Sequence, residues 1–569
     1  MASRRTAWHV GLAHGWAALT AIALAMAAGA QTPTEVLDDA VPRAEDPERA
    51  PLPPMPGAVA PGMLDPAADT TFTLRDVSLS GATVFGEADL SGLWADRLGQ
   101  PTRLSDIAAI TNAVQAFYRG EGYVFTRVLA SVEDLEAGRV VLNVVEARIE
   151  SVTIEEPDGP IGPVLALIER MAAPLEGLAN PTLDDLERVL LIMNDVPGIT
   201  RATAVPRAGT GGPGTLALAI NVSRSLVQGA VFFNNRQQPA FGEGLLGGVI
   251  EINSYGSAGD STRLVATTSA WTQARDFNER QIVQLEQFRY VGGSGLRMHL
   301  RALYGRSRPG AELEPLALEG SDVEFEIGAE YPAIRTRAVS LWLRGGFGLF
   351  DNDLDISGGV ARLSEDRRRI LFAEAETLLR DRYGFTAGAI GVRQGLGILG
   401  ASREGEGNLS RFDGDPQATV VHGRIEREQP IASGISAFVS ARGQYAMQPL
   451  LGGEEFSLGG TSIGRGYDPS EVLGDHGAGL TAELRWRQRT TVAEVPVQVE
   501  LYGFGDGGRV WNRGEGIPSA ATITSFGGGV RAIIANDTFV NLEVAKPTQR
   551  LQRTNSNAPR LFLTAQRRF

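Results

Sequence analysis

The chain has 569 residues, a formal net charge of −14 and no cysteine. The length exceeds that of a single ordinary domain, roughly 100–200 residues, so several modules or one large barrel are expected. The acidic balance disfavours a nucleic-acid-binding protein, and the lack of cysteine excludes disulfide scaffolds, thiolate metal sites and cysteine nucleophiles.

Residues 1–30 have the pattern of a cleaved secretory signal peptide. Arg4 and Arg5 provide the positive start, residues 17–28 are largely apolar, and residues 28–30 read Ala-Gly-Ala, a small-residue cleavage site. No later segment offers about 18 uninterrupted apolar residues, so no transmembrane helix is predicted. The mature protein is therefore expected outside the cytoplasm, either soluble in a periplasm or built into an outer membrane as a closed barrel.

Residues 31–71 are predicted to form a proline-rich linker. Nine prolines lie between Pro33 and Pro66, and proline removes a backbone donor and interrupts regular elements. The only helix candidate, residues 34–41, spans less than three turns and would be marginal alone. An extended segment is therefore expected here.

Residues 72–147 and 148–222 contain the same order of elements, β-α-α-β-β, which predicts two copies of a small α/β module. The first copy is predicted as a strand at 72–79, helices at 87–98 and 104–119, and strands at 123–132 and 139–145. The second copy is predicted as a strand at 149–154, helices at 162–173 and 183–194, and strands at 199–205 and 215–222.

Residues 223–569 switch to an apolar–polar alternation, which predicts sixteen strands of about 7–12 residues each. The predicted strands lie near 228–234, 245–253, 261–271, 281–291, 296–306, 322–331, 338–349, 370–379, 387–396, 417–427, 436–446, 479–489, 496–505, 525–534, 538–546 and 560–569.

The strand at 479–489 indicates what kind of β-structure this is. Leu480 and Trp486 fall on one face, whereas Glu483, Arg485 and Arg487 fall on the other. Successive charges suit a water-filled lumen better than a sandwich core, where unpaired charges are costly. The pattern favours a sixteen-stranded antiparallel membrane β-barrel; a secreted all-β enzyme or adhesin is the alternative.

The longest gap between predicted strands, residues 447–478, is expected to be a functional loop, because long loops in compact barrels are rarely passive. Arg465, Gly466 and Tyr467 lie at its centre among glycines. Asp506 lies in a glycine-rich strand and offers a carboxylate. A bidentate Arg465–Asp506 pair inside the lumen would hold the loop inward.

These motifs resemble those of two-partner secretion outer-membrane transporters, the hemolysin and filamentous haemagglutinin secretion/activation family. Arg465-Gly466-Tyr467 matches the family's lumenal loop motif. An aromatic-x-Asp-x-Gly motif on an inner strand matches Phe504, Asp506 and Gly508. The resemblance begins near Phe72 and covers almost the whole mature chain, with two POTRA-type modules before the barrel.

The resemblance implies how the parts are placed. The loop folds back into the barrel, where Arg465 pairs with Asp506, and the POTRA-type modules lie in the periplasm. The aromatic C-terminus, Phe569, is expected to act as an outer-membrane assembly signal, although Arg567 stands where an apolar residue is more usual. Family members often carry an N-terminal helix that plugs the barrel; the proline-broken segment 31–71 argues against one here.

The expected function is protein-conducting transport across the cell outer membrane without ATP, for one large β-rich exoprotein of the hemolysin or adhesin type. The alternatives are an insertase of the barrel-assembly class and, further away, a passive porin. Other implied partners are outer-membrane lipid, periplasmic chaperones and the barrel-assembly machinery, with no nucleic acid.

No catalytic residue, cofactor or metal site is expected. Residues 503–508 satisfy G-x-G-x-x-G after a strand, but no helix pattern follows, as a dinucleotide site requires. The histidines after the leader, His299, His422 and His476, are far apart in sequence and form no metal-binding spacing.

Overall fold

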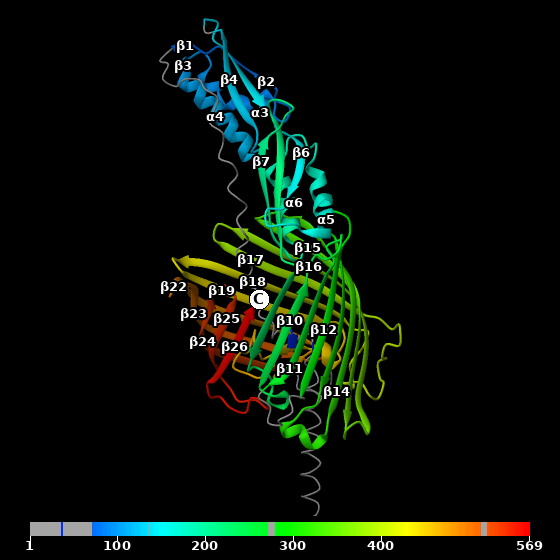
Figure 1. Ribbon diagram of the computed structural model, residues 1–569. Helices are drawn as coiled ribbons and strands as arrows, with labels where there is room; N and C mark the ends of the chain where they lie inside the picture. The colour runs from blue at the N-terminus through cyan, green and yellow to red at the C-terminus, as the bar shows by residue number, and fades with distance from the viewer. Residues whose placement is uncertain (1–32, 34–35, 38–70, 135, 271–278, 514–519) are drawn as a thin grey trace, which may run out of the picture.

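The computed structural model describes residues 71–134, 136–270, 279–513 and 520–569, together with Pro33, Val36 and Leu37. The predicted signal peptide at 1–30 and most of the predicted linker at 31–71 lie outside the described residues. Two small modules stand in a row at one end of a barrel (Figure 1). Among the described residues, no helix is long and apolar enough to cross a membrane.

Module 1 is a three-stranded sheet covered by one long helix. Its strands and helices are β1 (Thr71–Thr73), β2 (Asp76–Ser80), α3 (Glu87–Leu90), β3 (Pro101–Arg103), α4 (Leu104–Gly120), β4 (Arg127–Asp134) and β5 (Arg139–Val145). The sheet order is β2-β5-β4, with β2 parallel to β5. The apolar stripe of α4 faces this sheet and buries Ile107, Ile110 and Val114 against it.

Two predictions for module 1 need correction. The single strand expected at 72–79 is broken at Leu74 and Arg75, because β1 turns away to pair with β3 in a separate two-stranded ribbon. The helix expected at 87–98 is only α3 followed by two short 3-10 turns. Leu90 and Trp94 still reach the core, so the apolar spacing was read correctly although the helix was not continuous.

A half-buried carboxylate, Glu146, follows β5 of module 1. Glu146 accepts hydrogen bonds from the backbone N–H groups of Thr83 (2.8 Å) and Val84 (2.9 Å) and from the hydroxyl of Tyr118 (3.1 Å). Burial by itself raises the pKa of Glu146, but these hydrogen bonds outweigh it, so the pKa lies below the ordinary value of 4.5.

The stability of this corner should therefore depend on pH. A depressed folded-state pKa contributes stability above pH 4.5, and that contribution is lost as the pH falls through the folded value. We expect the protection factors of the Thr83 and Val84 amides, measured by hydrogen exchange on the full-length protein, to fall below pH 4.5. Glu146→Gln should lower them at neutral pH and flatten the profile; an unchanged profile would contradict this role.

Module 2 repeats the arrangement with two well-formed helices. Its elements are β6 (Arg148–Glu155), α5 (Leu165–Ala172), α6 (Leu183–Asn194), β7 (Ile199–Ala208) and β8 (Thr215–Arg224), with sheet order β6-β8-β7. Helix α6 begins with a capping box in which Thr182 and Asp185 bond each other's backbone. Both helices bury their apolar faces against the sheet.

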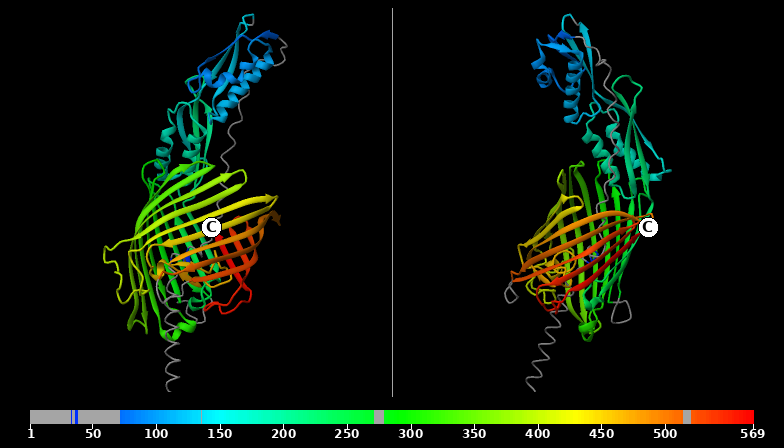
Figure 2. Two further views of the ribbon diagram at one scale, coloured as in Figure 1. Left: turned by 180° about the vertical axis from the view of Figure 1, so that it is seen from behind. Right: turned by 90° about the vertical axis from the view of Figure 1, so that its left-hand side faces the viewer.

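The remaining chain forms a closed barrel of sixteen antiparallel strands, as predicted (Figure 2). The strands are β9 (Val227–Asn234), β10 (Gly244–Ile252), β11 (Ser261–Ala270), β12 (Arg280–Tyr290), β13 (Arg297–Ser307), β14 (Glu319–Arg335), β15 (Val339–Ile356), β16 (Ala361–Asp381), β17 (Gly384–Gly395), β18 (Thr419–Ala432), β19 (Ile435–Ala446), β22 (His476–Val492), β23 (Val495–Trp511), β24 (Ala520–Ile534), β25 (Thr538–Pro547) and β26 (Arg560–Arg568).

The barrel has apolar side chains outside and polar ones inside. On β22, Leu484 is 58% exposed and Trp486 45% exposed, whereas Thr481 and Glu483 are 6% and 7% exposed. Several turns at the module end are short, for example 382–383 and 493–494, whereas most connections at the other end are longer. This asymmetry is typical of outer-membrane barrels with short periplasmic turns.

The first and last strands close the barrel. Five residue pairs join β9 to β26, from Thr564 opposite Asn234 to Arg568 opposite Ala230. Phe569 extends the seam, because its backbone exchanges two hydrogen bonds of 2.9 Å with Gly229. The Phe569 side chain faces outward and Arg567 lies beside it near Asp537, so the arginine sits at the edge of the apolar belt rather than within it.

Module 2 is fixed to the barrel by a buried ion pair. Asp195 directly follows α6. Each of its carboxylate oxygens accepts a hydrogen bond from the guanidinium of Arg335, at 2.6 and 2.7 Å. The Arg335 side chain is only 2% exposed. The Tyr290 hydroxyl also donates to the Asp195 carbonyl at 3.0 Å. The module is therefore held at a defined angle over the barrel mouth.

Asp195→Ala should loosen this junction, because it leaves a buried guanidinium unpaired at a cost of about 3 kcal/mol. We expect faster amide exchange at the end of α6 and faster proteolytic release of the modules. Arg201→Ala is a matched control, since its pair with Asp158 in the same module is exposed. Equal behaviour of the two variants would show that the buried pair does not hold the junction.

Candidate functional site

The connection between β19 and β22 folds into the lumen of the barrel. It spans residues 447–475 and contains a short hairpin of β20 (Phe456–Leu458) and β21 (Val472–Gly474) that the sequence did not predict. The last three residues of the predicted loop at 447–478 belong to β22. Leu458, Ile463 and Tyr467 are almost fully buried against Val510 and Ile523 of the wall, so the loop is packed rather than loose.

The tip of this loop presses its backbone onto the barrel wall. Gly464 has a φ of +82°, which favours glycine, and its carbonyl accepts a hydrogen bond from the Tyr467 N–H at 2.9 Å. A Cβ at Gly466 would lie 2.5 Å from the backbone nitrogen of Pro547 at the end of β25. Glycine is thus required at 466 by close approach of two backbones.

Arg465 is the centre of the site. Its Nε lies 3.2 Å from an Asp506 oxygen, and its Nη1 lies 2.7 Å from Glu483 and 3.3 Å from Glu543. Its Nη2 donates to the hydroxyl of Thr481 at 3.0 Å. The Arg465 side chain is 4% exposed, and it bridges β22, β23 and β25 in a buried position.

The expected bidentate Arg465–Asp506 pair is not what forms. Only one guanidinium nitrogen reaches Asp506, because the other two are taken by residues of the neighbouring strands. Asp506 instead accepts from the backbone N–H groups of Gly464 (3.0 Å) and Arg465 (3.3 Å) and from the hydroxyl of Ser525. The carboxylate therefore binds the loop's backbone as well as its side chain.

The other motif residues surround this centre. On β23, Phe504, Asp506 and Gly508 all face the lumen, and the Arg465 guanidinium carbon lies 3.4 Å from the centroid of the Phe504 ring. A Cβ at Gly508 would lie 2.8 Å from Leu458 of the loop. The Tyr467 hydroxyl accepts a hydrogen bond from the Gln549 N–H at 3.2 Å.

Several contributing residues were not found from the sequence. Arg236, on the β9–β10 connection, pairs with Glu543 and donates to the carbonyls of Gly460 (3.3 Å) and Arg465 (3.4 Å). From the other side of the seam, Arg560 on β26 pairs with Asp468 of the loop at 2.5 Å. The loop is thus held by β26 and by the connection that follows β9. Nothing in the sequence pointed to Arg236 or Arg560. It offered a sign only for Glu483 and Glu543, which fall at inward positions of the alternating pattern.

The charges of the junction continue along the inner wall. Arg531 joins Glu483 (3.2 Å) to Glu500 (2.7 Å), and Arg487 reaches the same Glu500 at 2.7 Å. These acids and arginines pair across neighbouring strands, so their buried charges compensate one another. The arrangement suits passage of a polypeptide along a polar wall.

The N-terminal residues that the structure describes occupy the lumen, contrary to the expected linker. Pro33, Val36 and Leu37 are helical, and Val36 and Leu37 are 0% and 4% exposed against inward side chains of β9–β13. Pro33 also lines a cavity at the far end of the barrel. Proline at a helix start and a protein wall allow a helix that would be marginal in water.

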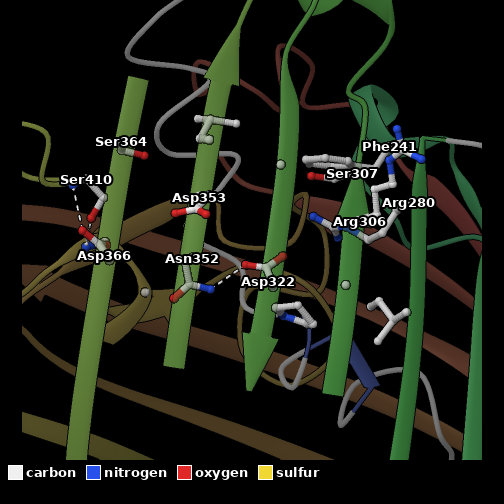
Figure 3. Close-up of a pocket in the computed structure, with 17 residues that line it drawn as sticks. Phe241, Arg280, Arg306, Ser307, Asp322, Asn352, Asp353, Ser364, Asp366 and Ser410 are labelled. Carbon is white, nitrogen blue, oxygen red and sulfur yellow. Dashed lines mark hydrogen bonds between the residues drawn. The ribbon is translucent and has the colours of Figure 1, made fainter. Parts of the chain in front are cut away.

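That cavity lies where β13–β16 approach the loops. Asp322 accepts from the Asn352 amide at 2.5 Å, and Asp366 accepts from the Ser410 N–H at 3.0 Å (Figure 3). Among the described residues, no group of three or more histidines and acids is placed to hold a metal ion. Residues 503–508 lie wholly within β23, so their glycine pattern opens no helix of a dinucleotide site.

Two family models match the chain. A POTRA domain of the ShlB type matches residues 72–147, and the haemolysin secretion/activation protein ShlB/FhaC/HecB matches residues 313–532. The heme/hemopexin transporter protein HuxB of Haemophilus influenzae is 22% identical over 470 residues, which cover 81% of this chain and 80% of HuxB.

A second curated relative and a solved structure agree with this. The outer membrane transporter CdiB of Dickeya dadantii is 24% identical over 479 residues, covering 82% of this chain and 80% of that protein. The structure of CdiB from Escherichia coli has a TM-score of 0.73 at 19% identity, covering 95% of this chain and 98% of CdiB, which shows a shared fold.

Proposed function

Because the chain belongs to the haemolysin secretion/activation family of two-partner secretion transporters of the outer membrane, we propose that it binds one unfolded β-rich exoprotein in the periplasm and passes it through the barrel to the cell surface. The observation that carries this proposal is the loop 447–475, held in the lumen by the Arg465 junction below two periplasmic modules. A loop held by many separate contacts can be displaced and can return.

Recognition of the exoprotein is proposed to use the edges of the module sheets. Strands β4 and β7 stand at one end of their sheets, in the orders β2-β5-β4 and β6-β8-β7. An extended polypeptide can add to such an edge through main-chain hydrogen bonds, without a fixed sequence. This mode suits an unfolded client with strong β-propensity.

Movement through the barrel is proposed to be driven by folding of the exoprotein outside the cell, since no ATP is present there. A folded segment cannot slide back through the lumen, so thermal motion is biased outward. The test is a client whose surface-side folding is blocked by mutation. It should stall in the barrel, whereas undiminished export would reject folding as the driving force.

The other proposed partners concern the barrel itself. Outward side chains such as Leu480 and Leu484 contact outer-membrane lipid. Periplasmic chaperones and the barrel-assembly machinery are proposed to deliver the chain, with the C-terminal strand that ends at Phe569 as the assembly signal. The relatives are transporters, and we propose no catalytic role.

Co-expression with a large exoprotein encoded beside the chain tests the function. Release of that exoprotein into the medium should require the transporter and should be lost when residues 72–222 are removed, with barrel amount followed by heat-modifiable migration. An insertase of the barrel-assembly class predicts the opposite pattern, in which other outer-membrane barrels decline and the exoprotein is released normally.

A further inference from the structure

The inner wall carries an apolar strip beside its charged region. The strip comprises one or two inward side chains from each of β9–β13, namely Phe232, Leu245, Val249, Val265, Ile282 and Leu303, each at most 9% exposed. On the opposite wall the inward positions are arginines and acids, such as Arg485 and Glu500. Apolar side chains have no structural reason to line a lumen filled with water unless something covers them.

The apolar side chains of the strip form one contact cluster across neighbouring strands, although Gln284 stands between Val265 and Leu303. Val249 lies opposite Val265, and one strand further on Gln284 lies opposite Leu303. In the next row, Ile282 lies opposite Gly305. A Cβ at Gly305 would lie 2.9 Å from the Pro33 ring, so the missing side chain at Gly305 leaves room for Pro33 against the wall. The strip thus accepts a polypeptide that lies along the wall.

In the structure, the chain's own N-terminal segment occupies the strip. Val36 and Leu37 join the same apolar cluster, and Pro33 lies at its edge. Export of an unfolded polypeptide needs the lumen in which Pro33, Val36 and Leu37 lie. When the segment leaves, the strip would face water unless apolar side chains of the passing polypeptide replace those of Val36 and Leu37.

We propose that the strip on β9–β13 is a sliding contact site for apolar side chains of the exported polypeptide, and that Val36 and Leu37 occupy it at rest. The inference rests on the proposed transport function. A β-rich client presents an apolar side chain at every second residue. Successive side chains can therefore replace one another on the strip, and no single position of the client is bound strongly enough to halt its movement. The occupant is thus an extended, alternating polypeptide segment rather than lipid.

Two sets of variants distinguish a strip that contacts the exported polypeptide from a strip that binds only the chain's own N-terminal residues. Val36→Asp/Leu37→Asp releases the N-terminal residues from the strip and leaves the strip apolar. Val265→Thr/Ile282→Thr/Leu303→Asn also releases them, but by making the strip itself polar. Both should raise channel conductance in planar bilayers to a similar extent. Export of the co-expressed exoprotein should persist in the first and fall about tenfold in the second, at equal barrel amount.

Equal export by the two sets would overturn the proposal, since the strip would then serve only the chain's own segment. A failure of the proposed function looks different, because the wild-type chain would then form channels but export nothing. Triple substitution could also disturb assembly, so a second measurement uses a photo-crosslinking residue in place of Ile282, in the Val36→Asp/Leu37→Asp background with a stalled client.

The crosslinker at Ile282 should capture the client, whereas one at the adjacent Val283, which faces outward and is 47% exposed, should not. Capture at Gln444 on the opposite, polar wall without capture at Ile282 would overturn the proposal, because the client would then travel along the charged side.

Discussion

Arg465→Ala is expected to reduce export of the exoprotein by about tenfold or more, with the barrel present in the outer membrane at near-normal amount. The substitution leaves Glu483, Asp506 and Glu543 without their shared cation inside a buried pocket. Removing one partner of a buried ion pair costs about 3–5 kcal/mol, which is enough to release the loop from the wall. Secreted exoprotein is measured against barrel amount in the same cells.

Two further variants test the cause. Arg465→Lys keeps the charge but cannot reach three strands at once, so it should be partly defective. Arg427→Ala is a matched control on the barrel wall, since Arg427 pairs with an exposed Asp381 at 2.9 Å. Export at the wild-type level by Arg465→Ala would show that the junction is not needed for transport.

Gly466→Val is expected to give the same export defect while leaving every charged residue in place. The new side chain would start 2.5 Å from the backbone nitrogen of Pro547 and 2.8 Å from the carbonyl carbon of Lys546. Both atoms belong to β25, whose backbone cannot move without breaking its pairing with β24, so the loop tip must move instead. Loop position is measured by crosslinking between cysteines introduced into the loop and the wall.

Gly505→Ala is the control for this variant. Gly505 lies next to Asp506 on β23 but faces outward, and a Cβ there meets nothing within 4 Å. Export and loop position should both stay normal. A defect in Gly505→Ala equal to that of Gly466→Val would mean that glycine content of the region matters more than contact between loop and wall.

The architecture was largely readable from the sequence because lipid outside and water inside impose a strict period of two. All sixteen predicted strands of the barrel are present, but several of them, including β14, β15, β16, β22 and β23, are much longer than predicted. Strand β16 has 21 residues, because Arg367 and Arg369 at its far end pair with acids of β15 and extend the hairpin beyond the apolar belt. A charged segment without apolar alternation gives no local sign of being a strand.

The site could be predicted only in part, for a physical reason. The sequence pointed to Arg465 and Asp506, and the structure places them together, but the pairing geometry depends on Glu483 and Glu543 from strands far apart in the sequence. The N-terminal segment was misread because proline content and short length describe a peptide in water. Burial of Val36 and Leu37 against the apolar wall stabilises a helical conformation that would be marginal for the same peptide in water.

The central claim, that this one chain conducts an unfolded exoprotein without ATP, is tested most directly in proteoliposomes that contain only the purified transporter. The unfolded exoprotein is added on the module side, and its protection from protease inside the vesicles is measured without nucleotide. The account predicts protected exoprotein with the wild-type chain and almost none with Arg465→Ala. Equal protection by both chains, or protection only when ATP and further proteins are supplied, would contradict it.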